Sequence, residues 1–66
     1  MKIIIKATIK AVAKLQVQIN EVYEYSINQH LNNNLWTIDC KNLAALDVIL
    51  SLIHNEKNIK LWDVIR

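Results

Sequence analysis

Residues 35–65 carry a pattern of strand, helix and strand that constrains the fold more than any other part of this sequence. Leu35–Cys40 is a short run rich in β-branched and aromatic residues, and Asn42 occupies the position of a helix N-cap. Leu43–His54 keeps a helical hydrophobic pattern, and residues 59–65 follow a polar turn as a second strand. The sequence therefore predicts a βαβ unit whose two strands run parallel with a right-handed crossover.

The first thirty residues fit two hydrophobic periods. Every odd position from 3 to 19 is apolar, which is the alternation of a strand. From residue 9 onward apolar side chains also recur at helical spacing, at Val12, Leu15, Ile19, Val22, Tyr23, Ile27 and Leu31. A strand over residues 3–19 would far exceed the usual five or six residues, and a hairpin there would have to turn without glycine. We therefore predict a strand over residues 2–7 and one helix over residues 9–31, ended by the asparagines at 32–34.

These elements predict a small α/β fold in a single domain that spans residues 1–66. The predicted element order is β-α-β-α-β, with the βαβ unit at the C-terminal end. The alternation near the N-terminus leaves one alternative open. In this alternative the fold is α+β, and an N-terminal β-hairpin precedes the same βαβ unit.

Length and composition indicate a protein that associates. A chain of 66 residues buries only about 60% of its unfolded surface, so it needs disulfides, metal or association for stability. Cys40 is the only cysteine, and Cys and His form no cluster, so disulfides and metal are not expected. The absence of glycine excludes phosphate-binding loops, and we expect no cofactor. A homodimer or a protein partner remains, and no small-molecule substrate is expected.

Several features bear on where the protein works. The single thiol fits a cytoplasmic protein, and no apolar run approaches the ~20 residues of a membrane span. A net charge of +2 is too small to indicate a polyanionic partner. The abundance of Asn, Ile and Lys is typical of AT-rich genomes such as those of many phages and mobile elements. With a viral origin the location would be the host cytoplasm.

The segment from Thr37 to Leu50 resembles the core of the STAS domain, the domain of sulfate transporters and anti-sigma-factor antagonists. The matching positions are Ile38, Asp39, Asn42, Leu43, Leu46 and Asp47. Val48 stands where that family has its regulatory Ser or Thr, and Leu50 stands where a Gly follows. The resemblance covers about residues 35–65. It implies a protein-docking module that has lost its phosphorylation switch.

No catalytic constellation emerges from the sequence, and we expect no enzyme. Asp39 and Asp47 are candidates for an acid and base pair, but turn formation and stabilisation of a first helical turn account for them. Cys40 is expected to be a small buried hydrophobe. His30 and His54 are expected in the last turns of the two helices, where a cationic imidazole complements the helix dipole.

Two sets of residues are candidates for binding. Lys2, Lys6, Lys10 and Lys14 would form a basic stripe on an extended ribbon, as a nucleic-acid contact requires. An apolar protein interface is predicted at Ala45, Val48 and Leu52 on the far side of the second helix, and at Trp36 and Trp62 on an uncovered sheet face.

The predicted function is that of a small non-enzymatic protein-binding module that occupies a partner surface. Such a module would act as a regulator or as an inhibitor encoded by a phage or mobile element and directed at a host protein such as a defence complex. The alternative is a small nucleic-acid-binding protein that uses the basic stripe.

Overall fold

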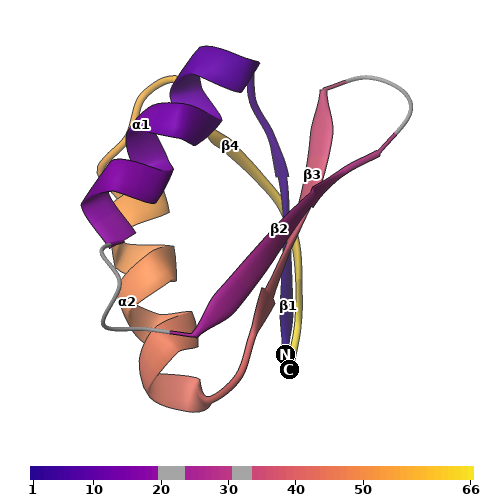
Figure 1. The fold of residues 1–66 in the computed structure, drawn as a ribbon, viewed down its shortest axis with the longest axis vertical. Helices are drawn as coiled ribbons and strands as arrows, with labels where there is room; N and C mark the ends of the chain where they lie inside the picture. The colour runs from indigo at the N-terminus through magenta and orange to yellow at the C-terminus, as the bar shows by residue number, and fades with distance from the viewer. Residues whose placement is uncertain (20–23, 31–33) are drawn as a thin grey trace.

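The structure is a computed structural model of the 66-residue chain, and it describes residues 1–19, 24–30 and 34–66. The elements follow one another in the order β-α-β-β-α-β (Figure 1). They are β1 (Lys2–Lys6), α1 (Ile9–Ile19), β2 (Tyr25–Gln29), β3 (Leu35–Cys40), α2 (Leu43–His54) and β4 (Lys60–Ile65). The predicted α/β fold class is confirmed, with one more strand than the predicted order contains.

The described strands form one antiparallel sheet in the order β2-β3-β1-β4. β3 and β4 run in the same direction, as predicted for the βαβ unit, but β1 lies between them and pairs with both. Likewise, β3 lies between β1 and β2 and pairs with both of them. Two interleaved split βαβ units in this element order define the ferredoxin-like topology.

Residues 9–31 do not form the single helix that the sequence predicts. α1 ends at Ile19, and Tyr25–Gln29 is the edge strand β2. Tyr25 and Ile27 lie opposite Cys40 and Ile38, so pairing with β3 overrides the helical pattern to which Ile27 also belongs. The alternative fold places its hairpin at the N-terminus, where residues 9–19 are helical, and the observed antiparallel neighbours are β2 and β3. Parts of the predicted helix and its end, residues 20–23 and 31–33, lie outside the described residues.

α2 begins and ends where the sequence predicts. The side chain of its N-cap, Asn42, accepts a hydrogen bond from the Ala45 N–H at 2.9 Å. At the other end the Asn55 N–H donates to the Ser51 carbonyl, and His54 occupies the last turn. The capped helix has a defined start directly after β3.

Both helices cover the same face of the sheet (Figure 1). Ile3, Ile5 and Ile38 are fully buried on this face and pack against side chains of both helices. The remaining buried side chains are Ala7, Ala11, Val12, Leu15, Ile19, Trp36, Cys40, Ala45, Leu46, Ile49, Ile53 and Ile59. The other face carries the alternate residues of each strand and has no covering layer among the described residues.

Candidate functional site

A groove of about 730 Å³ runs between α2 and β4 and is called the α2/β4 groove below. Its apolar lining consists of Leu50, Ile53, Ile59, Leu61 and Val64. Its polar lining carries both signs of charge, with Asp47 and Glu56 against Lys60 and Arg66, together with Ser51 and His54. A mainly apolar groove of this volume has the size and lining typical of binding sites.

β4 is an edge strand with large apolar side chains in solvent. It pairs with β1 alone among the described strands. Leu61, Trp62 and Ile65 are 47%, 57% and 49% exposed. Trp62 has no partner on β1 because the register shifts there at a bulge, where β4 has one residue more than β1. Leu61 and Trp62 therefore extend the apolar lining of the groove to the edge of the sheet, whereas Ile65 lies opposite Lys2 on the open face.

The outward side of α2 adjoins this groove. Val48 and Leu52 line a shallow hollow of about 380 Å³ together with Asn55. Asp47 and Ser51 line both this hollow and the α2/β4 groove, so the two are neighbours across one ridge of the helix. We call the groove, the hollow and Trp62 together the docking surface.

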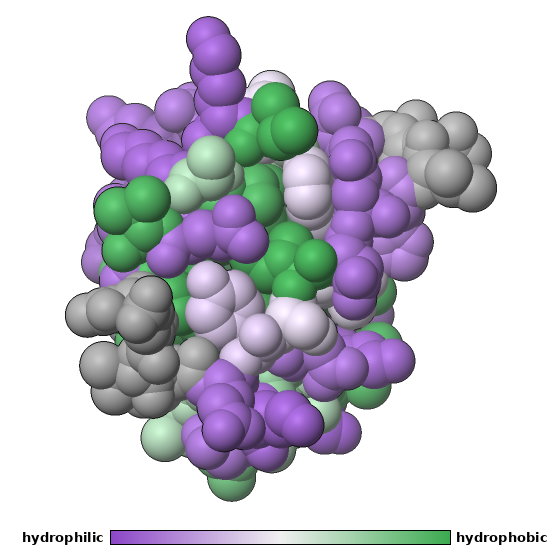
Figure 2. Space-filling model, viewed as in Figure 1, coloured by the Kyte–Doolittle hydropathy of each residue, from purple (hydrophilic) through white to green (hydrophobic). Residues whose placement is uncertain are grey.

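α1 also carries exposed apolar side chains. In Figure 2 hydrophilic side chains form most of the outline, and hydrophobic ones show between them. Val17 on α1 is 82% exposed and Ile9 is 69% exposed. Neither residue lines any of the hollows described in this section. Single exposed apolar residues of this kind are ordinary for a globular protein.

The structure divides the predicted apolar interface. Val48 and Leu52 are half-buried on the outward side of α2, and Trp62 is exposed. Ala45 and Trp36 instead lie in the core, with Ala45 fully buried. Ala45 is covered because α1 packs against α2. Trp36 lies on the helix-covered face of β3, where its Nε1 donates a hydrogen bond to the Ala7 carbonyl at 2.9 Å. A partner could reach neither residue without unfolding the domain.

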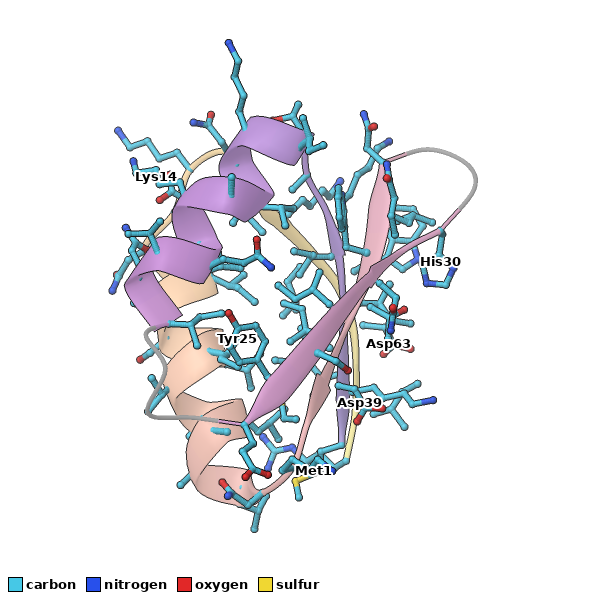
Figure 3. All side chains as sticks on the ribbon, in the orientation of Figure 1. Met1, Lys14, Tyr25, His30, Asp39 and Asp63 are labelled. Atoms are coloured by element: carbon cyan, nitrogen blue, oxygen red, sulfur yellow. The ribbon has the colours of Figure 1, made fainter. Side chains whose placement is uncertain are left out.

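The predicted lysine stripe is also divided. Lys2 and Lys6 lie on the open face of β1, whereas Lys10 and Lys14 belong to α1. Lys14 forms an ion pair with Glu56 at 3.6 Å (Figure 3). Lys6 instead has two lysines nearby that sequence reasoning missed, Lys57 and Lys60, which line one hollow with it.

The two predicted carboxylates do not form an acid and base pair. Asp39 is exposed on β3 and lies opposite Lys2, on the sheet face away from the helices (Figure 3). Asp47 is exposed on α2, which covers the other face. The sheet therefore separates the two side chains.

Cys40 is buried, and His30 is hydrogen-bonded to a neighbouring strand. Burial of Cys40 raises its pKa above the ordinary value of 9.0; the N-terminal amine opposes this shift, and Asp39 adds to it. A thiol with a raised pKa is a poor nucleophile at neutral pH. His30 follows β2 and not a helix, so the predicted capping role is wrong for it; its Nε2 forms a hydrogen bond with the Thr37 hydroxyl (Figure 3). Within the described ranges no three His, Cys, Asp or Glu side chains are arranged to hold a metal ion.

Comparison of the chain with protein-family models, curated proteins and solved structures finds no match. The resemblance of residues 35–65 to the STAS domain therefore stays a prediction. Among the described helices none is long and apolar enough to cross a membrane.

Proposed function

We propose that this protein is a small non-enzymatic protein-binding module that acts by covering an apolar surface of a partner with its docking surface. The observation that supports this most is the α2/β4 groove, whose apolar lining includes half-exposed Leu61 and is followed along β4 by exposed Trp62. Aromatic and aliphatic side chains beside an apolar groove are the usual anchors of protein interfaces.

The smallest form of this proposal is a homodimer. A 66-residue domain buries a modest core, and covering half-exposed apolar residues with a second copy adds stability that the single chain lacks. The rim of the groove carries two acidic and two basic side chains, Asp47 and Glu56 against Lys60 and Arg66. The formal charges of these four side chains sum to zero, so the rims of two copies do not repel each other through a net charge of one sign. A regulator or inhibitor of another protein, in the cytoplasm and of phage or mobile-element origin, would use the same surface.

Nucleic-acid binding through Lys2, Lys6, Lys10 and Lys14 has less support. These lysines belong to a strand and a helix in different layers of the domain. Non-specific single-strand binding also uses aromatic side chains on the binding face. The central strands β1 and β3 place Ile4, Leu35 and Thr37 on the open face, and the aromatic Trp36 points into the core.

The docking surface can be mapped by recording amide chemical shifts of the protein at a high and a low concentration. We expect the concentration-dependent shifts to cluster on α2 and β4, around Val48, Leu52 and Trp62, and to persist in high salt because the contact is apolar. Trp62→Asp should abolish them by placing a charge in the interface. Val17→Asp makes the same kind of change on α1 and should leave them unchanged. Shifts that centre on α1, or that vanish with added salt, would refute this surface.

A further inference from the structure

Three lysines from separate parts of the chain converge on one hollow of about 370 Å³, which we call the basic hollow. Lys6 ends β1, Lys57 belongs to the turn after α2, and Lys60 begins β4. Ala7, Thr8, Asn34 and Asn58 complete the lining. This hollow is separate from the α2/β4 groove, although Lys60 lies on the rim of both.

The arrangement concentrates positive charge. Three of the chain's eight cationic side chains line the hollow, and none of the five acidic residues in the described part of the chain does. Lys6 and Lys60 lie directly opposite each other in the β1–β4 register. Like charges at directly opposed positions destabilise a sheet, and an anion between them would remove that cost. The ion pair found among the described residues, Lys14 with Glu56, does not involve these lysines.

The remaining polar groups of the hollow are also able to donate hydrogen bonds. Thr8 Oγ1 accepts the Ala11 N–H at 3.3 Å, which leaves its hydroxyl hydrogen free to donate. Asn34 and Asn58 each bring an amide NH2 group. Asn34 is held in the left-handed region, with φ of 54°, and its carbonyl accepts the Ala7 N–H at 2.9 Å. This hydrogen bond joins the residue after β1 to the residue before β3, and it fixes the backbone that carries these donors.

We propose that the basic hollow binds a compact phosphate anion, such as the diphosphate or terminal phosphate of a small molecule. Lysine ammonium groups bind phosphate as point charges, and hydroxyl and amide donors add hydrogen bonds to its oxygens. The cations surround one hollow and do not continue as a track, because Lys2, Lys10 and Lys14 do not line it. A single phosphate group fits this distribution better than the repeated phosphates of a nucleic-acid strand.

The test is a titration of the labelled protein with inorganic pyrophosphate, followed by amide chemical shifts, with sodium chloride at matched ionic strength as the reference. We expect saturable shifts confined to residues 6–8, 34 and 57–60. The double variant Lys57→Gln/Lys60→Gln should bind roughly tenfold more weakly or worse, because it loses two charge-assisted contacts. The control Lys2→Gln/Lys10→Gln removes the same charge from exposed positions outside the hollow and should bind as the parent does.

Three results would overturn the proposal. Shifts with pyrophosphate that equal those with chloride would mean that no phosphate site exists. Equal weakening by the two double variants would mean that only net charge matters. A single-stranded oligonucleotide that binds more tightly than pyrophosphate and also shifts residues 2, 10 and 14 would identify an extended nucleic-acid surface. Because Lys60 lies on the rim of both the basic hollow and the α2/β4 groove, the proposed function is judged by Val48, Leu52 and Trp62, which do not line the basic hollow.

Discussion

This chain contains no glycine, and asparagine occupies positions where glycine or another capping residue often stands. Asn34 adopts the left-handed conformation before β3, and Asn42 caps α2 through its side chain. The N-cap was predictable because Asn precedes an unbroken helical pattern. The role of Asn34 was not predictable, because the sequence predicts the end of a helix there, whereas the structure has a turn that leads into β3.

Replacing Asn42 with Ala should destabilise the protein by about 1 kcal/mol, because the Ala45 N–H loses its side-chain acceptor. Asn55→Ala is a matched control at the other end of α2, since Asn55 contributes its backbone N–H and not its side chain to the cap. The free energy of unfolding in urea measures both changes. An equal loss of stability in the two variants would show that the Asn42 side chain does not cap the helix.

At the scale of elements, local pattern predicted β3 and α2 with their observed bounds, and β1 and β4 to within one residue. β2 was missed because Ile27 continues the helical spacing of the preceding residues, and only pairing with β3 shows that it belongs to a strand. The edge position of β4 could not be predicted for a related reason. Strand order depends on which distant segments pair, so Leu61 and Ile65 gave no local signal that they would remain exposed.

The edge strand β4 also carries features that limit uncontrolled pairing. The bulge at Trp62 interrupts its register, and the Asp63 carboxylate accepts the Val64 N–H at 2.8 Å. Asp63→Ala should therefore increase higher-order association, since it frees this N–H and removes a charge from the edge. Turbidity and sedimentation at raised concentration measure this effect. Asp39→Ala removes the same charge from the inner strand β3, and comparable aggregation of both variants would mean that Asp63 does not protect the edge.

At the scale of the whole molecule, the sequence predicted a single α/β domain but not the insertion of β1 between β3 and β4. That insertion leaves β4 at an edge beside α2, which creates the docking surface. It also brings Lys6 against Lys60, residues far apart in sequence. Of the predicted interface, Val48, Leu52 and Trp62 remain accessible. Ala45 is buried because α1 packs against α2, and Trp36 is buried because it lies on the helix-covered face of β3.

The most direct test of the docking surface is the solution mass of the protein, measured by light scattering over a dilution series. We expect twice the 7.7 kDa chain mass at high concentration, with dissociation to the single-chain mass on dilution. Trp62→Asp should hold the single-chain mass throughout, while Val17→Asp follows the parent curve. A single-chain mass for the parent at every concentration, or a dimer that Trp62→Asp leaves intact, would contradict the account.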